Sequence, residues 1–384
     1  MDSRIESQPQ SKWLKLFHQY PIQQAISLYL TIADFLVLCQ VCKGLDELRN
    51  CMLSKVSNIN VRLGGFVDDP IIFRSQLGNN GALISGSFAL NIFELGHRKI
   101  SYLDVFIKEG ADADRFTHYI REHEKYQDDN PGETARTRYT YGSSARPGRK
   151  LRITRTSGPP VQHILTSAYT TAHINIITWN KAYSIFPRQT LINHQFYPLR
   201  SLDDDFGSSL NELIPQNWTT RDIIWPDLAG TEGPKIEGLR RVGDSSSLVI
   251  LLDTDSVQAP STPDSVIEYA QFDVLAKYLG PHRSRDRFLR IRAEKLASPA
   301  IRHGYVTADT GWRSYAAERL RRWSWLELYK LEPRSRPFLS TSMYPLVSDI
   351  QMSQVPQSWD YADDQIPVWY REWEQTLVGK GRAF

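Results

Sequence analysis

Residues 81–107 carry the strongest structural signal in this 384-residue chain. The run GALIS at residues 81–85 is suited to a buried strand, and Gly86 and Ser87 follow it at once. Apolar residues at helical spacing continue to Leu95 before Gly96, and residues 102–107 form a second apolar run. We therefore predict a strand, a tight turn, a largely buried helix that stops at Gly96, and another strand, the start of a mixed α/β or α+β domain.

The turn at Gly86 and Ser87 is a candidate phosphate-binding or nucleotide-binding site. Backbone N–H groups at the start of a helix and a serine hydroxyl can face a phosphate, and glycine permits its close approach. A serine at the start of a helix also occurs as an ordinary cap that serves stability alone. The turn by itself is compatible with both interpretations.

Glycine-serine, a helix and a strand that carries Asp-x-Asp together resemble the nucleotidyltransferase fold. From about residue 20 to residue 275 the chain resembles a family of fungal proteins that bear a degenerate version of this fold behind an F-box-like segment. Two further motifs carry the resemblance, HINIITWNKAYSIFPRQTL at residues 173–191 and RRVGDSSSLVILLD at residues 240–253. The resemblance implies a nucleotidyltransferase-like mixed sheet flanked by helices.

The metal-binding carboxylates of that fold are mostly missing here. Nucleotidyl transfer uses two divalent cations held by carboxylates. Where the family reads approximately Ser-Asp-Leu-Asp, this chain has a tyrosine before the last acid: Ser-Tyr102-Leu-Asp104. Asp104 can be one ligand, but a neutral phenol at Tyr102 cannot replace a charged pair of oxygens.

The third carboxylate is expected from a later strand, and the chain has no Asp or Glu between Glu133 and Asp203. The candidate strand at residues 150–154 carries Arg152, which repels a cation. We therefore expect Asp104 to be a structural carboxylate that pairs locally. The protein is then a nucleotidyltransferase-like pseudoenzyme without a cofactor.

The alternative is an active, Mg²⁺-dependent nucleotidyltransferase in which Asp104 is catalytic. Its metal site would be rebuilt from nearby acids, for which the candidates are Glu94, Glu109, Asp112 and Asp114. Nothing in the spacing of these residues requires such a site.

Apolar residues recur at three- and four-residue spacing in residues 20–48 and predict two or three short amphipathic helices. The order Pro21, Leu30, Leu36 and Leu38 around an Asp-Phe pair resembles an F-box, which docks on the Skp adaptor of ubiquitin ligase complexes. The resemblance implies these four residues as partner-binding residues. Periodicity alone favours a helical subdomain packed on the rest of the chain.

From Thr134 to Leu202 the chain has ten Lys or Arg and no acid. Residues 134–157 predict a hairpin, and its basic strands with Tyr139 and Tyr141 could bind a nucleotide or RNA through phosphate contacts and stacking. The alternative is a solvated hairpin whose charges protect an edge strand. The solvated hairpin is favoured, because the net charge is only +3 and no nucleic-acid-binding module is recognisable.

The downstream half has weaker signals. Residues 240–244 predict a turn before a strand at residues 248–252, and residues 256–265 predict a loop. Leu289, Ala293 and Leu296 predict the apolar stripe of a surface helix. Six of the ten tryptophans lie in residues 312–373, where they are either core anchors or a binding surface.

We predict three parts: an F-box-like helical segment at 1–55, a nucleotidyltransferase-like domain at 56–275 and a helical or irregular tryptophan-rich region at 276–384. The chain has no run long enough to span a membrane, no signal-like start and only three cysteines, which favours a cytoplasmic or nuclear protein. The expected function is noncatalytic recruitment through protein–protein interaction. The first part would hold a Skp-type adaptor and the second a client or ligand.

Overall fold

The computed structural model describes residues 58–95, 99–131, 137–200, 206–207, 210, 218–220, 236–278, 287–336, 355–356 and 358–378, together with Ile22 and Asp34. The predicted partner-binding residues Pro21, Leu30, Leu36 and Leu38 lie outside the described residues, as do the three cysteines.

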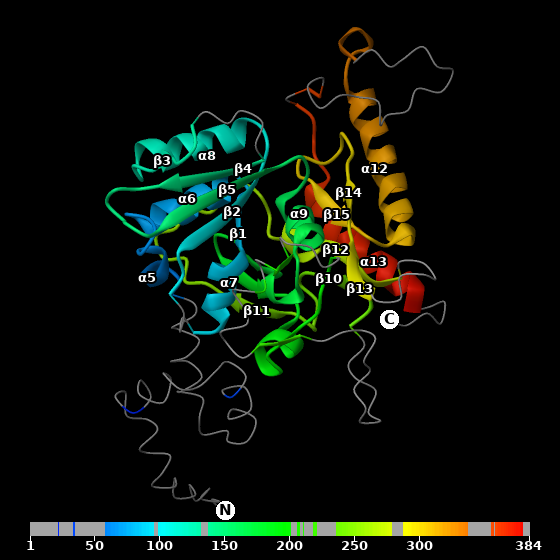
Figure 1. Ribbon diagram of the computed structural model, residues 1–384. Helices are drawn as coiled ribbons and strands as arrows, with labels where there is room; N and C mark the ends of the chain where they lie inside the picture. Colours follow the sequence, from blue (N-terminus) through cyan, green and yellow to red (C-terminus); the bar gives the residue numbers. More distant parts are fainter. Residues whose placement is uncertain are drawn as a thin grey trace, which may run out of the picture.

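A mixed sheet of eight strands forms the centre of the described protein (Figure 1). Strands β2 and β5 are parallel, and the other neighbouring pairs are antiparallel. In order across the sheet, the strands are β11 (Leu248–Leu251), β7 (Lys181–Ser184), β6 (Asn175–Ile177), β1 (Leu83–Ser85), β2 (Tyr102–Lys108), β5 (Lys150–Thr156), β4 (Arg138–Gly142) and β3 (Gln127–Asp128). The predicted mixed class, a sheet flanked by helices, is confirmed.

The predicted order of strand, Gly-Ser turn, helix and strand is also confirmed. Strand β1 leads directly into helix α7 (Gly86–Phe93), and β2 returns antiparallel to β1. The helix ends at Phe93, earlier than predicted, and Leu95 after it has a φ of 59°. The predicted stop, Gly96, lies outside the described residues. The helical spacing of apolar residues continues past the end of the helix because Leu95 is itself buried.

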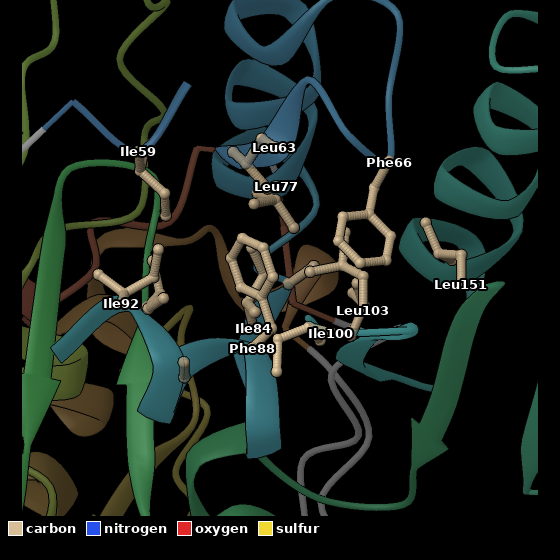
Figure 2. Close-up of a cluster of buried hydrophobic side chains, with 14 of the residues drawn as sticks. Ile59, Leu63, Phe66, Leu77, Ile84, Phe88, Ile92, Ile100, Leu103 and Leu151 are labelled. Atoms are coloured by element: carbon tan, nitrogen blue, oxygen red, sulfur yellow. The ribbon is translucent and has the colours of Figure 1, made fainter. Parts of the chain in front are cut away.

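Helices cover both faces of the large sheet (Figure 1). One face packs against α7, α5 (Asn60–Leu63), α6 (Pro70–Asn79) and α8 (Ala111–Glu122), and the other packs against α9 (Pro160–Ser167). Figure 2 shows Leu63, Leu77 and Phe88 of three helices around Ile84 and Leu103 of the central strands. All five side chains are at most 2% exposed, which makes this cluster the main source of hydrophobic stabilisation for the domain.

Successive side chains of β2 alternate between the two faces of the large sheet. Leu103 and Val105 belong to the core under α5 to α8, whereas Phe106 belongs to the core under α9. Because successive residues of a strand point to opposite faces, Tyr102 and Asp104 share the face of Phe106.

A second sheet packs under α9. It consists of β10 (Gly238–Arg241), β12 (Gln271–Tyr278) and β13 (Arg287–Arg292), and β14 (Glu294–Leu296) pairs with β15 (Tyr305–Thr307) next to it. The predicted strand at residues 248–252 is confirmed as β11. The predicted turn before it is shifted, because Arg240 and Arg241 belong to β10 and the chain turns at residues 242–247.

The predicted surface helix over Leu289, Ala293 and Leu296 is wrong, because this segment forms β13 and β14. Leu289, Ile291 and Ala293 are buried while Arg290 and Arg292 are exposed, which is the two-residue period of a strand. The expected boundary at residue 275 falls inside β12, which pairs with β10 on one side and β13 on the other.

The C-terminal part is built on α12 (Thr310–Lys330) and α13 (Ile366–Val378). Trp312 and Trp373 are 2% and 5% exposed, and their rings lie 5.0 and 5.5 Å from that of Tyr370. These two tryptophans are therefore core anchors. The remaining elements are α11 (Ser265–Glu268), β8 (Gln195–Phe196) paired with β9 (Thr219–Thr220), the 3-10 helices η2 (Thr171–His173), η5 (Pro333–Ser335) and η8 (Asp363–Gln365), and the π-helical turn η3 (Arg188–Ile192).

Within the described ranges, the model contains no helix that combines the length and the apolar character needed to span a bilayer.

His163 on α9 predicts a pH dependence of stability. Its ring packs 5.7 Å from that of Phe106, and burial, together with the charges of Arg138 and Arg200, lowers its pKa. The unfolded chain therefore takes up a proton near pH 6.5 that the folded protein resists, so the free energy of unfolding should fall as pH drops below about 6.5. Substitution His163→Gln should reduce this slope by up to about 1.4 kcal/mol per pH unit, measured by urea denaturation from pH 7 to pH 5.

A residual slope is expected in the His163→Gln variant because burial also lowers the pKa of His303. An unchanged slope would show that protonation of His163 costs the folded protein nothing.

Candidate functional site

The Gly-Ser turn lies directly against the carboxylate of Asp104. Ser85, the last residue of β1, pairs in register with Asp104 of β2, and its hydroxyl donates to the carbonyl of Asn175 at 2.6 Å. Gly86 has a φ of +75°, and a Cβ built there would lie 3.0 Å from Oδ2 of Asp104. Ser87, half-buried, follows in the first turn of α7. The structure thus brings Gly86, Ser87 and Asp104, the three residues singled out in this part of the sequence, to one place.

This close approach predicts that Gly86→Ala destabilises the protein by about 2 kcal/mol, because the substitution combines a strained positive φ with a tight contact to Asp104. Gly81→Ala is a matched control. Gly81 has a φ of +60°, but nothing lies within 4 Å of a Cβ there, so only the backbone cost of about 1 kcal/mol applies. Urea denaturation measures both variants. Equal losses would show that the contact with Asp104 relaxes without cost.

Asp104 is held by Arg152 from the neighbouring strand. The parallel register of β2 and β5 places Asp104 opposite Arg152. Nε of Arg152 donates to Oδ1 at 2.6 Å and Nη2 donates to Oδ2 at 2.6 Å, so the guanidinium engages both carboxylate oxygens. The side chain of Asp104 is 8% exposed and that of Arg152 is 23% exposed. Such a two-pronged, largely desolvated pair is the strong form of a charge-assisted hydrogen bond.

Tyr102 completes a three-residue cluster with this pair. The Cζ atom of Arg152 lies 4.2 Å from the centroid of the Tyr102 ring, which is a close cation–π contact. Asp104 therefore binds the edge of the Arg152 guanidinium, and the ring of Tyr102 packs against its face. From the resemblance we expected metal ligands to be missing here, but the sequence did not reveal that Arg152 is the partner of Asp104, because the pairing depends on the register of two strands 48 residues apart.

These residues do not fit a pair of magnesium ions. Mg²⁺ requires carboxylate oxygens in near-octahedral geometry. Both oxygens of Asp104 accept hydrogen bonds from a guanidinium, and the neighbouring positions hold a phenol and a cation. In the part of the chain that the structure describes, no group of three or more His, Cys, Asp or Glu is arranged to hold a metal ion.

The acids proposed for a rebuilt site lie elsewhere. Glu109 and Asp114 both accept hydrogen bonds from Arg155, at 3.1 and 2.8 Å, and Asp112 pairs with Arg115 on the surface of α8. Glu94 is the C-cap residue of α7, at the other end of the helix from Gly86. The described structure therefore does not bring these acids together at the Gly-Ser turn.

The basic hairpin exists as predicted, with β4 and β5 antiparallel. Its cations, however, are mostly bound by acids from other segments: Lys150 pairs with Asp129, Arg155 with Asp114 and Glu109, Arg146 with Asp68, and Arg152 with Asp104. Tyr141 is 1% exposed, and Tyr139 lies against the guanidinium of Arg155. Among the described residues, Tyr139, Tyr141 and these four cations of the hairpin are thus engaged within the protein.

Comparison with known proteins adds little to this description. No family model and no curated protein matches the chain. One solved structure, described as "The structure of CCA-adding enzyme apo form I", aligns with 17% sequence identity and a TM-score of 0.30. The alignment covers 44% of this chain and 43% of that chain, and at this TM-score it establishes neither a shared fold nor a shared activity.

Proposed function

We propose that this protein is a noncatalytic binding protein built on a degenerate nucleotidyltransferase-type domain, and that residues 20–48 recruit it to a Skp-type adaptor. The bidentate pair of Arg152 with Asp104 carries the noncatalytic part of the proposal. The recruiting part rests on the F-box resemblance of the N-terminal sequence.

The pair opposes metal binding through charge. A divalent cation at Asp104 would have to displace the guanidinium from both oxygens and then sit beside the displaced positive charge. At about 4 Å, a charge of +2 next to +1 repels with about 8 kcal/mol at an effective dielectric constant of 20. Glu109, Asp112 and Asp114 do not offset this repulsion, because they lie away from the Gly-Ser turn and pair with Arg155 and Arg115.

Metal binding by the full chain tests this part. Titration with Mn²⁺, followed by electron paramagnetic resonance, is expected to reveal no site at Asp104 tighter than about 1 mM. The double substitution Tyr102→Asp with Arg152→Asp places acids at the positions where active members of the fold carry them. Mn²⁺ should raise the thermal midpoint of this variant but not that of the natural protein.

An activity assay completes the test. Incubation with labelled nucleoside triphosphates and Mg²⁺ is expected to give no incorporation above that of a heat-inactivated sample. Metal-dependent incorporation that Asp104→Asn abolishes, in a variant with a native near-ultraviolet spectrum, would overturn the noncatalytic assignment and establish the nucleotidyltransferase alternative.

Co-purification tests the recruiting part. A Skp-type adaptor should co-purify with the full chain, and the double substitution Leu36→Lys with Leu38→Lys should abolish the interaction. Leu326→Lys is a suitable control because Leu326 is 57% exposed on α12, far along the chain from the recruiting segment. Retention of the adaptor by the double variant, or its absence from the natural protein, contradicts the recruiting role.

A further inference from the structure

A cavity lies at the end of β1 opposite the Gly-Ser turn. Its volume is about 400 Å³, and it is lined by the end of α6, the start of β1, the end of β2, the start of α9, the loop at residues 260–264 and residues 302–304. Lys108 lines it at the end of β2, four residues beyond Asp104, which corresponds to about 13 Å along a strand. The cavity is therefore a different place from the cluster of Tyr102, Asp104 and Arg152.

Besides Arg115, which pairs with Asp112, three exposed cations line this cavity: Lys108 of β2, Lys295 of β14 and Arg302 of the following turn. Among the residues that the structure describes, none of the three side chains is in an ion pair, in contrast to the cations of the basic hairpin. The same three residues, with His303, also line an adjoining hollow of about 240 Å³. The cations thus gather at the junction of two hollows, although Lys108 is far from Lys295 and Arg302 in the sequence.

The acids of the cavity are already engaged. Asp112 pairs with Arg115, and Asp264 accepts from Lys181 at 2.6 Å and from the amide of Asn180. Asp112 therefore has its own cation, whereas Asp264 shares Lys181 with Glu268, which also accepts from Lys181 at 2.6 Å. Burial lowers the pKa of His303, so at neutral pH the uncompensated positive charge belongs to the three cations.

Asp363 of η8, the short helix directly before α13, holds the turn that carries Arg302 in place. The carboxylate of Asp363 accepts from the backbone N–H groups of Arg302 and His303 at 2.8 and 3.2 Å, and Tyr305 donates to the carbonyl of Asp363. The carboxylate of Asp363 therefore anchors the turn through its backbone, and among the described residues it forms no ion pair with the guanidinium of Arg302. A cation on an anchored turn is suited to bind a ligand at low entropic cost.

The rest of the lining is mixed, with the polar residues Asn79, Asn80, Thr178, Ser261 and Thr262 beside apolar groups. Trp179 is half-buried and packs with Pro260 against Gly78, and Pro159 and Val161 line the cavity at the start of α9. A cavity of this size with apolar walls and a few convergent polar groups is typical of small-molecule sites. Its apolar walls can accept a ring or a hydrocarbon part, whereas the cations require an anion.

We infer that this cavity binds a small organic phosphate, with the phosphate at Lys108, Lys295 and Arg302 and the uncharged part against Trp179 and the prolines. A phosphate carries more than one negative charge and three outer oxygens, so it can satisfy several cations at once, whereas one carboxylate cannot. The volume of about 400 Å³ suits a small molecule. The inference is independent of the proposed function, because it uses none of the residues around Asp104 or in the recruiting segment.

Calorimetric titration of the full chain with AMP tests the inference, with adenosine and inorganic phosphate as partial probes and citrate as a carboxylate probe. AMP should bind with a dissociation constant below about 1 mM and more tightly than each of the other three probes. The triple variant K108Q/K295Q/R302Q should bind AMP at least about tenfold more weakly. The triple variant R290Q/R322Q/R334Q removes the same charge at exposed positions that do not line the cavity, and it should bind AMP as the natural protein does.

Unchanged thermal midpoints are expected for both triple variants because all six side chains are exposed. If both triple variants bind AMP equally weakly, the overall charge of the protein explains the effect and the inference is overturned. No AMP binding up to about 10 mM, or adenosine binding as tightly as AMP, would also overturn it.

Discussion

Substitution Arg152→Gln is expected to lower the free energy of unfolding by about 3 kcal/mol. The substitution leaves the carboxylate of Asp104, 8% exposed, without the guanidinium that binds both of its oxygens. Loss of one partner of a buried ion pair typically costs 3–5 kcal/mol, and the 23% exposure of Arg152 places the expected value at the lower end. Urea denaturation monitored by tryptophan fluorescence measures the change.

A double-mutant cycle measures the coupling energy between Asp104 and Arg152 separately from their other contacts. Because Asp104→Asn removes the unpaired charge that Arg152→Gln leaves behind, the double variant should be less destabilised than the sum of the two single variants, by about 1.5 kcal/mol or more. Arg321→Gln is the surface control, since Arg321 pairs with Glu318 at 55% and 63% exposure and should cost at most about 0.5 kcal/mol.

Additive effects of Asp104→Asn and Arg152→Gln would contradict the coupling that the geometry predicts. They would also weaken the proposed function, because a loosely held arginine could leave Asp104 to a metal ion.

The second large effect is expected from Arg74→Met, at about 3 kcal/mol of lost stability. Arg74 of α6 is 1% exposed, donates twice to the carbonyl of Trp179, at 2.9 and 2.7 Å, and donates once to Asn60 at 3.0 Å. Methionine fills much of the space but leaves that buried carbonyl without its donors, which costs about 1–3 kcal/mol, and it leaves part of the volume empty. Chemical denaturation is again the measurement.

Arg74→Lys tests whether geometry or charge matters at this position. Burial lowers the pKa of Arg74 to about 10, so the guanidinium stays charged at neutral pH. A lysine keeps the charge but cannot reach both partners with a planar fork, so it should stabilise no better than methionine. Arg290→Met is the exposed control and should change stability by less than about 0.5 kcal/mol. Full stability of Arg74→Lys would show that charge alone suffices.

The pattern of apolar residues predicted the centre of the fold but not its second sheet. At residues 81–107 the strand, turn and helix signals agree with one another, so the local pattern sufficed. At β13, by contrast, Leu289 and Ala293 fit helical spacing while Leu289, Ile291 and Ala293 fit strand spacing. This segment forms a strand because it pairs with β12, which itself pairs with β10 on its other side.

The candidate site shows the same division. That Tyr102 and Arg152 cannot bind a metal ion could be read from the chain, because residue identity alone decides whether a side chain can bind a cation. The cavity at Lys108, Lys295 and Arg302 gave no sequence signal, because its cations come from three separate elements with no common spacing.

The amino-acid sequence by itself therefore determined the central strand–turn–helix–strand unit and the chemistry available at residues 102, 104 and 152. The tertiary structure decided which charges meet: Arg152 with Asp104, the hairpin cations with distant acids, and three cations at a cavity without acidic partners among the described residues. Backbone periodicity is a local property of a few consecutive residues, whereas an ion pair depends on strand register and packing between segments far apart in the chain.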